Sequence, residues 1–211
     1  MKKRLYRKKN SEIIFSLGSF VLTLCCTFLL IVSTFITVNI LYPSVGYDAK
    51  SGEDFFKAFA LIPQIPAVIF VGALLGKNLG ITSVILYILT GLFFLPVFAL
   101  GGGMSYFAQY GFGYILAYIP AVWLLTTRIN GVFSFKNISL GVLYAVLTIH
   151  LTGIIYMTLI ALIQGEGWNF IKGWIIHQSG MKIIFDYILS FALVYFVKAI
   201  QPILWCYRKP R

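Results

Sequence analysis

The stretch FLPVFALGGGMSYFAQYGFGYILAYIP, residues 94–120, joins two apolar segments through a glycine-rich, aromatic connection. Pro96 cannot sustain a hydrogen bond in a helix interior, so we expect the first helix to end there. Gly101, Gly102 and Gly103 then allow the backbone to bend through positive φ angles. Irregular backbone at membrane depth is tolerated where protein buries it or water wets it. The stretch therefore predicts a polar ligand site between two membrane helices.

Aromatic and amide side chains behind the glycines are candidates for the lining of such a site. Tyrosine offers flat apolar surface with a hydrogen-bonding tip, and pockets for small molecules combine such surfaces with a few polar groups. The candidates are Tyr106, Gln109, Gly113 and Tyr114. The alternative is an ordinary interfacial belt of aromatic residues with a glycine turn.

The composition identifies a membrane protein. Of the 211 residues, 60% are hydrophobic and 11% are charged, and the mean hydropathy is +0.91, whereas soluble domains are about 45–50% apolar. Blocks of about 20 apolar residues leave room for about six spans, which must be helices because lipid offers the backbone no partners. We predict an all-α integral membrane protein with one six-helix domain over residues 13–206. The spans are expected at 13–41, 58–76, 79–96, 110–127, 138–163 and 183–206.

The basic residues set the expected orientation. The net charge is +11, and its clusters lie in the flanking segments 1–12 and 207–211 rather than on a soluble face, so nucleic acid is not an expected partner. With both termini in the cytoplasm, twelve Lys and Arg fall inside and four outside, and Lys198 lies near the inner end of the last span, as the positive-inside rule requires. We expect a multi-pass protein of the cell membrane, with longer outer loops at 42–57, 97–109 and 164–182.

Small residues recur at a spacing of four in two places. Such spacing lets helices approach closely in lipid, where van der Waals contact drives association. The two sets are Gly72, Gly76 and Gly80, and Ser19, Thr23 and Thr27. The glycines predict internal packing of the second and third spans. The first-span set fits either internal packing or docking onto another membrane protein.

Two polar residues within the predicted spans are candidates for function. Asp186 is the only acidic residue in a predicted span, and a carboxylate there costs about 2.5–3.5 kcal/mol on insertion scales. It either faces a substrate or forms a structural ion pair with Lys182, four positions earlier. His150 is a candidate for packing, cavity lining or proton transfer.

The absence of several sequence motifs narrows the function. The sequence contains no GxxxxGK[ST] phosphate loop, HExxH or GxSxG motif, and its three cysteines have no metal-site spacing. We therefore expect no catalytic residues, no metal site and no cofactor.

The central part of the chain resembles the BioY family, the membrane-embedded biotin-binding subunits of energy-coupling factor transporters. The resemblance is continuous over about 70–130, through GALLGKNLGITSVILYILTGLFFLPVFALGGG and SYFAQYGFGYILAYIPAVW. Residues at family positions are Gly76, Gly80, Tyr87, Gly91, Leu95, Pro96, Val97, Phe98, Gly101, Gly102, Gly103, Gly113 and Tyr114.

The resemblance implies six helices that hold biotin near the outer face under the loop after the third span. It also implies a transmembrane coupling subunit and two ATPases as partners. Many members carry Asp-x-x-Lys at the start of the last helix. Here Asp186 corresponds to the Asp, but Leu189 stands at the Lys position, and Lys182 is a hypothetical substitute from the preceding turn. The Ala-x-x-x-Ala docking pattern of the family is missing, and the first-span Ser and Thr set is its nearest equivalent.

The sequence thus predicts the substrate-binding membrane subunit of a vitamin importer, with biotin as cargo. The glycine loop and the four candidates behind it would form the lid and one wall, and Asp186 with Lys182 and His150 would anchor polar groups. One alternative keeps the architecture and changes the vitamin. A second is a small intramembrane enzyme that transfers protons between His150 and Asp186, which must then lie within hydrogen-bond reach. A third is a scaffold without an enclosed polar cavity.

Overall fold

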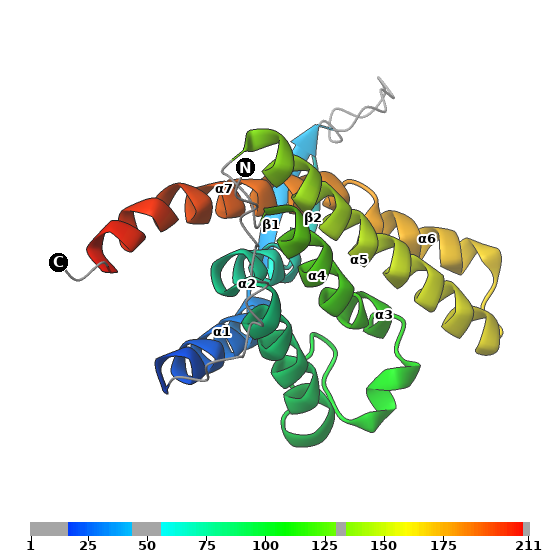
Figure 1. The fold of residues 1–211 in the computed structure, drawn as a ribbon. Coiled ribbons are helices and arrows are strands. Elements are labelled where there is room, and N and C mark those ends of the chain that lie inside the picture. The colour runs from blue at the N-terminus through cyan, green and yellow to red at the C-terminus, as the bar shows by residue number, and fades with distance from the viewer. Residues whose placement is uncertain (1–16, 44–55, 130–133, 209–211) are drawn as a thin grey trace, which may run out of the picture.

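The computed structural model describes residues 17–43, 56–129 and 134–208 as a predominantly helical protein (Figure 1). The predicted basic segment 1–12 and the last three residues of the predicted tail lie outside the described residues. The helices are α1 (Leu17–Phe35), α2 (Gln64–Leu89), α3 (Phe112–Leu116), α4 (Tyr118–Ile129), α5 (Phe135–Ile163), α6 (Trp168–Ser179) and α7 (Lys182–Arg208). The other elements are strands β1 (Val38–Pro43) and β2 (Phe56–Leu61), the π-helical turn η1 (Thr90–Phe94) and the 3-10 turn η2 (Met104–Ala108).

Helix α2 is the centre of the molecule. It packs against α1, α4 and α7, and α5 packs in turn against α3, α4 and α7. In Figure 1, α4 and α5 run side by side, and α7 extends from the end of α6 to the opposite side of the molecule. The core is apolar, and Val68, Ile69 and Val71 of α2 are fully buried. Five segments of the described chain are helical, long and apolar enough to cross a membrane. They are Leu17–Phe35, Gln64–Phe94, Phe112–Ile129, Phe135–Ile163 and Trp168–Gln201.

A sharp kink explains why two predicted spans fall in one segment. The predictions 58–76 and 79–96 meet at Gly76, whose backbone angles are φ 77° and ψ −172°, a conformation that strongly favours glycine. The two arms of α2 fold back on each other, and the Cα of Gly72 lies 3.2 Å from the place that a Cβ on Gly80 would take. The predicted role in internal packing is confirmed for Gly72 and Gly80, whereas a Cβ on Gly76 would meet nothing within 4 Å.

A β-hairpin corrects the prediction that the first two spans are helical throughout. Helix α1 ends at Phe35, and β1 pairs antiparallel with β2, from Val38 opposite Leu61 to Pro43 opposite Phe56. The ladder supplies partners for the backbone groups that each strand turns toward the other. A short apolar run cannot distinguish a strand from a buried helical segment. Part of the predicted outer loop 42–57, residues 44–55, lies outside the described residues.

The Ser and Thr set of the first span packs inside the protein. Thr23 and Thr27 are buried against α2. The Thr27 hydroxyl donates to the backbone oxygen of Ser83 at 3.3 Å, and the Ser83 hydroxyl donates to the backbone oxygen of Thr23 at 3.2 Å. These bonds join α1 to the second arm of α2. The structure therefore favours internal packing over docking for this face.

The prediction of an outer loop at 164–182 is wrong for most of that range, because the segment contains α6. The segment carries Asn169, Lys172 and His177 among apolar residues, which lowered its hydropathy without breaking its helical pattern. Gly180 separates α6 from α7 with ψ at −113°, and its N–H still donates to the Ile176 oxygen at 3.0 Å. The break places the end of α6 against the start of α7.

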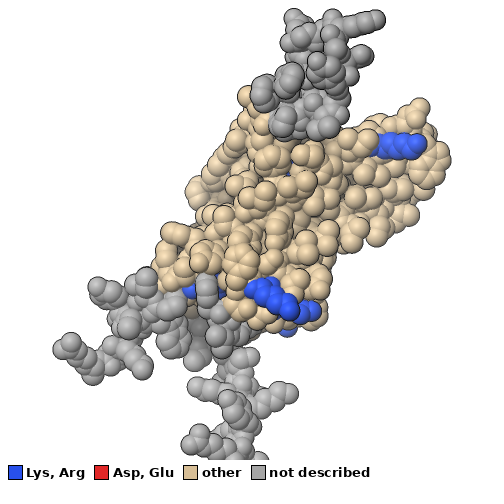
Figure 2. All heavy atoms as spheres, turned by 90° about the horizontal axis from the view of Figure 1, so that it is seen from above, with Lys and Arg blue, Asp and Glu red and all other residues tan. Residues whose placement is uncertain are grey.

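The described surface suits a lipid environment. Large apolar side chains are exposed along α1, α5 and α7, for example Phe28, Ile155 and Phe196 at 61–66% exposure. On the face seen in Figure 2, Lys and Arg gather in two places near opposite ends of the molecule. The chain is an integral membrane protein, because this uncharged apolar surface would be exposed to water otherwise.

Candidate functional site

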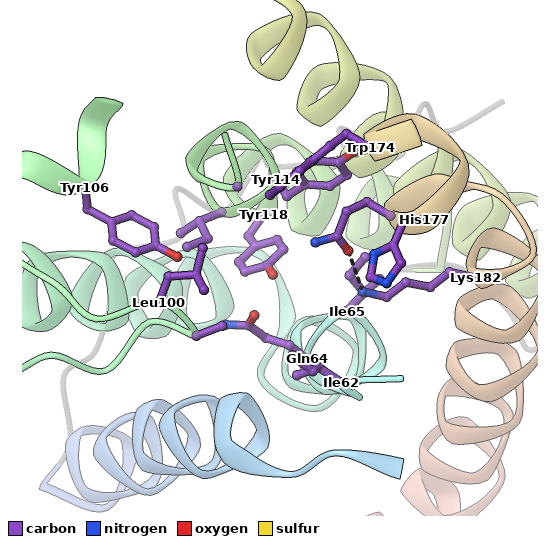
Figure 3. Close-up of a pocket in the computed structure, with 14 residues that line it drawn as sticks. Ile62, Gln64, Ile65, Leu100, Tyr106, Tyr114, Tyr118, Trp174, His177 and Lys182 are labelled. Atoms are coloured by element: carbon purple, nitrogen blue, oxygen red, sulfur yellow. Dashed lines mark hydrogen bonds between the residues drawn. The ribbon is translucent and has the colours of Figure 1, made fainter. Parts of the chain in front are cut away.

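A cavity of about 310 Å³ opens between the start of α2, the connection after η1, and the helices α3, α4, α6 and α7. Its lining is mostly apolar with convergent phenol, amide, imidazole and ammonium groups, as small-molecule sites usually are. The lining residues are Ile62, Gln64, Ile65, Ala99, Leu100, Tyr106, Gly111, Tyr114, Ile115, Tyr118, Trp174, His177, Gln178 and Lys182. Figure 3 shows the polar tips of Gln64, Tyr106 and Tyr118 turned toward one another across it.

The cover of the cavity comes from residues 99–111, but the three glycines do not line it. Gly103 donates its N–H to the oxygen of Gly91 at 2.8 Å. A Cβ on Gly102 would lie 2.6 Å from that same oxygen, so this part of the turn is pressed against the end of the preceding helix. On either side of the glycines, the residues that reach the cavity are Ala99, Leu100, Tyr106 and Gly111. The structure therefore places Gly101, Gly102 and Gly103 in the cover and not in the lining of this cavity.

Aromatic packing holds the cover in place from below. Phe98 is buried against Gly91, where a Cβ would meet its ring at 2.1 Å. The Phe98 ring lies 4.6 Å from that of Tyr106 and 5.4 Å from that of Tyr87. Burial raises the pKa of the Tyr106 phenol, and a hydrogen bond with the Leu100 backbone opposes that shift. Tyr106 is consequently a neutral hydrogen-bonding group of the cavity wall.

The outer side of the cover is tied to the end of α5. The Tyr156 hydroxyl donates to the backbone oxygen of Phe107 at 2.5 Å, and the Gln164 amide donates to the oxygen of Ala108 at 3.0 Å. The Tyr110 hydroxyl donates to Gln164 and, at 3.1 Å, to Glu166. Gln109 is exposed and does not line the cavity, so the structure separates it from the other predicted wall residues.

Tyr114 reaches the cavity because two glycines let α3 approach α5. A Cβ on Gly113 would lie 2.2 Å from the Cβ of Tyr156, and one on Gly153 would lie 2.4 Å from the ring of Tyr114. Gly113 therefore acts through close packing and does not itself line the cavity. The Tyr114 hydroxyl lies 2.9 Å from the hydroxyl of Ser179.

His150 and Asp186 lie together in the protein interior and do not line the cavity. They are 1% and 0% exposed, and the His150 Nε2 lies 3.3 Å from the Asp186 Oδ2. The His150 Nδ1 lies 2.9 Å from the Ser179 hydroxyl. The geometric condition for the intramembrane-enzyme alternative is thus met. The predicted Lys182–Asp186 ion pair is replaced by a His150–Asp186 pair.

Lys182 lines the cavity together with side chains of α6. Its Nζ lies 3.4 Å from the Gln178 Oε1, and Figure 3 shows this contact beside His177. The indole Nε1 of Trp174 is buried with no hydrogen-bond partner among the described residues. The α6 side of the cavity therefore offers a cation and further donors.

Gln64 presents a hydrogen-bond acceptor on the opposite side of the cavity. Its Nε2 donates to the Thr34 hydroxyl at 3.0 Å and to the Tyr87 hydroxyl at 2.5 Å. The Thr34 hydroxyl donates to the Leu30 oxygen at 3.1 Å, so it can only accept from Gln64. Because both amide donors are used, the Gln64 Oε1 is left for the cavity.

Of the ten predicted site residues, Tyr106, Tyr114 and Lys182 line the cavity. The sequence analysis missed Gln64, Tyr118, Trp174, His177 and Gln178. A signal existed for part of this set, since Trp174, Gln178 and Lys182 are four positions apart, but the segment was interpreted as a loop. Gln64 is an isolated amide between Pro63 and Pro66 in an apolar run. The described lining residues include a cation and no carboxylate, so they suit an anionic small molecule.

The sequence profile of the BioY family matches residues 6–205. The chain belongs to the BioY family. A protein of Lysinibacillus sphaericus named as a probable biotin transporter BioY is 41% identical over 69 residues, 33% of this chain and 35% of that protein. The match therefore spans about a third of that relative. A crystal structure of the S-component for biotin from an ECF-type ABC transporter is 19% identical, with a TM-score of 0.64, and the alignment covers 88% of this chain and 91% of that one.

The structural similarity establishes that the two proteins share a fold. The names of the two relatives describe transport proteins. Membership of the BioY family agrees with the long apolar helices in assigning a multi-pass membrane protein.

Proposed function

We propose that this protein is the membrane-embedded substrate-binding subunit of a biotin uptake transporter. The observation that carries the proposal is the cavity under residues 99–111, with a cation on one side and acceptors on the other. A scaffold without a ligand would not need such a cavity. The names of the two relatives support biotin as the cargo.

The functional groups of biotin are complementary to the cavity wall. Its valerate carboxylate would pair with the Lys182 ammonium, because an anion in a largely apolar cavity needs an opposite charge. Its bicyclic body would pack on Tyr106 and Trp174, which offer flat apolar surface. Its two ureido N–H groups would donate to acceptors such as the Gln64 Oε1.

The remaining predicted residues have roles in shape and positioning in this proposal. The three glycines would set the bend that brings Leu100 and Tyr106 over the ligand. Gly113 would let α3 pack closely against α5, so that Tyr114 reaches the cavity. Asp186 and His150 would act behind the wall rather than on the ligand. Gln109, which is exposed, is the weakest member of the predicted set.

We further propose that the protein crosses the membrane six times with both termini in the cytoplasm. The kink at Gly76 supports this topology, because the chain reverses direction between the two arms of α2. Residues 13–206 would form the membrane domain, with basic segments 1–12 and 207–211 in the cytoplasm. A transmembrane coupling subunit and ATPase subunits are the proposed partners for energising uptake.

Ligand-induced thermal stabilisation of the purified protein tests the cargo. Binding to the folded state stabilises it by about 2.7 kcal/mol at a ligand concentration of 100 Kd. A panel of biotin, thiamine, riboflavin, pantothenate and nicotinate should show a saturable rise in Tm with biotin alone. A rise with another member and none with biotin would favour the alternative cargo. No rise with any vitamin would contradict the binding role.

Lys182→Met tests how the carboxylate is held. Because the variant keeps the length of the apolar stem and removes the charge, biotin affinity should fall roughly 10- to 100-fold, as expected for a charge-assisted pair of about 1.5–3 kcal/mol. Lys198→Met is the matched control, since Lys198 also lies on α7 and contacts a glutamine, Gln201, at 3.1 Å but does not line the cavity. Equal affinities for the two variants would exclude Lys182 from the site.

A further inference from the structure

Four polar side chains connect the buried interior to the cavity wall in an unbranched series of hydrogen bonds. Asp186 contacts His150 at 3.3 Å, His150 contacts Ser179 at 2.9 Å, and Ser179 contacts Tyr114 at 2.9 Å. The first three are at most 5% exposed, and of the four Tyr114 alone lines the cavity. The series runs from α7 through α5 and the end of α6 to α3.

The chemistry of these groups gives the series a direction. For an ionised Asp186, which only accepts hydrogen bonds, the His150 Nε2 that faces it must carry a proton. In the neutral imidazole, Nδ1 is then an acceptor, and the Ser179 hydroxyl must donate to it. A hydroxyl has one proton, so the Ser179 oxygen can only accept from the Tyr114 hydroxyl. The single proton of the Tyr114 hydroxyl is then committed to the bond with Ser179.

We propose that Asp186, His150 and Ser179 are positioning residues that fix Tyr114 as a hydrogen-bond acceptor toward the cavity, so that the site selects a ligand group with an N–H or O–H donor. Without them the Tyr114 hydroxyl could rotate and either donate or accept. The Tyr114 oxygen keeps a lone pair for the ligand once its proton is committed to Ser179.

The burial of Asp186 supports an indirect role. Its side chain is fully buried and does not line the cavity, and its Oδ1 has no hydrogen-bond partner among the described residues. A carboxylate placed there is costly unless it is paired. Its described partner is His150, whose other nitrogen contacts Ser179, so in the proposed series Asp186 orients the imidazole.

The cavity then has two oriented acceptors, because the Gln64 Oε1 is fixed as an acceptor by Thr34 and Tyr87. Two acceptors match a ligand with two donors, such as a cyclic urea with its pair of N–H groups. This step rests on the proposed function, which supplies the identity of the ligand. The hydrogen-bond direction at Tyr114 does not depend on it.

The tautomer of His150 tests the direction of the series in the ligand-free protein. The chain contains two histidines, so ¹⁵N-histidine labelling gives two imidazoles, and His177→Gln assigns them. We expect the proton of His150 on Nε2 and a bare Nδ1, with this pattern lost in Asp186→Asn. A proton on Nδ1, alone or together with one on Nε2, would overturn the proposal, whatever ligand the protein binds.

A double-mutant cycle tests whether Ser179 acts through the Tyr114 hydroxyl. Ser179→Ala should lower biotin affinity about fivefold in the wild-type background, the value of one hydrogen bond, and should have no further effect in Tyr114→Phe. Ser190→Ala is the control, because Ser190 is equally buried and has no hydrogen-bond partner among the described residues. Its effect should be the same in both backgrounds.

The two tests separate this inference from the proposed function. Independent losses for Ser179→Ala and Tyr114→Phe would show ordinary packing and would overturn the positioning role while leaving biotin binding intact. If the wild-type protein shows the Nε2–H tautomer but no stabilisation by biotin, the proposed cargo fails and the orientation of Tyr114 stands. If Ser179→Ala does not fold, the tautomer of the wild-type protein still decides.

Discussion

Two groups of glycines surround the cavity and have opposite physical roles. At Gly101 and Gly103 the φ angles are positive, 114° and 87°, and a Cβ would meet nothing within 4 Å. At Gly113 and Gly153 the backbone is helical, and a Cβ would lie 2.2–2.4 Å from atoms of a tyrosine. The first pair is needed for backbone conformation and the second for close approach.

This difference shows which glycines determine the position of the ligand wall. A turn that needs positive φ can tolerate a side chain at the cost of local strain, because there is space for it. A close contact cannot, because helices α3 and α5 would have to separate and Tyr114 would move with α3. The seat of Tyr114, formed by Gly113 and Gly153, should therefore be more sensitive to substitution than the turn.

The largest expected effect is that of Gly113→Ala. The new methyl group would overlap the Cβ of Tyr156, which is fixed to the backbone and cannot rotate away. We expect a loss of about 3 kcal/mol or more in the free energy of unfolding, the upper part of the range for overpacking. The fall in Tm of the purified protein measures it.

Gly111→Ala is the matched control for this substitution. A Cβ at Gly111 has the Tyr106 hydroxyl as its nearest atom, at 4.0 Å, and φ there is −77°. Its Tm should stay close to that of the wild-type protein. Similar destabilisation by both variants would refute the distinction between close approach and open space.

Gly153→Ala should destabilise the protein less than Gly113→Ala and should also lower biotin affinity. Its methyl group would meet the ring of Tyr114 at 2.4 Å, and a ring can turn where a Cβ cannot. We expect about 2 kcal/mol of destabilisation, together with a roughly tenfold loss of biotin affinity, because the turned ring would break the bond to Ser179. Isothermal titration of the detergent-solubilised protein gives the affinity.

A glycine in an uncrowded part of a helix provides the comparison for Gly153. Gly173 lies on α6, and a Cβ there would meet nothing within 4 Å. Gly173→Ala should leave biotin affinity unchanged and raise the stability by up to about 1 kcal/mol, since alanine is the better helix former. A loss of affinity in this variant would mean that α6 itself is sensitive to any added methyl group.

The apolar segments and the division of residues 58–96 into two spans could be predicted from sequence because they depend on local pattern. A run of apolar residues indicates burial in lipid, and Gly76 between two such runs indicates a break. The hairpin of β1 and β2 could not be predicted, since strand pairing joins residues that are far apart along the chain. Helix α6 was missed because its polar residues, of which His177 and Gln178 line the cavity, lower the hydropathy of the segment as an aqueous loop would.

The candidate site was predicted in part for a related reason. Tyr106, Tyr114 and Lys182 stood out by residue type and by their neighbours, and they line the cavity. The segment around Gly101 has the composition of a ligand-binding loop, but a sequence does not show which side of a bend faces the cavity. Gln64 could be recognised only after Thr34 and Tyr87 were seen to orient its amide.

Gly101→Ala should have a smaller effect than either substitution at the Tyr114 seat. The φ of 114° disfavours a Cβ by about 1 kcal/mol, and no neighbouring atom would be displaced. The free energy of unfolding should fall by that amount, while biotin affinity changes less than about threefold. A tenfold loss of affinity would show that the turn contacts the ligand after all, and would restore the glycines to the site.

Gln109→Ala should have the smallest effect of the series. Gln109 is exposed, and its backbone, which the substitution preserves, makes its described hydrogen bonds to Tyr106 and Phe112. Surface substitutions of this kind usually change stability by less than about 0.5 kcal/mol, and the side chain lies outside the cavity lining. Biotin affinity and Tm should both match the wild-type values. A clear loss of affinity would mean that the cover moves on binding and brings the Gln109 amide onto the ligand. The distinction between glycines that shape the turn and side chains that contact the ligand would then hold for the ligand-free protein alone.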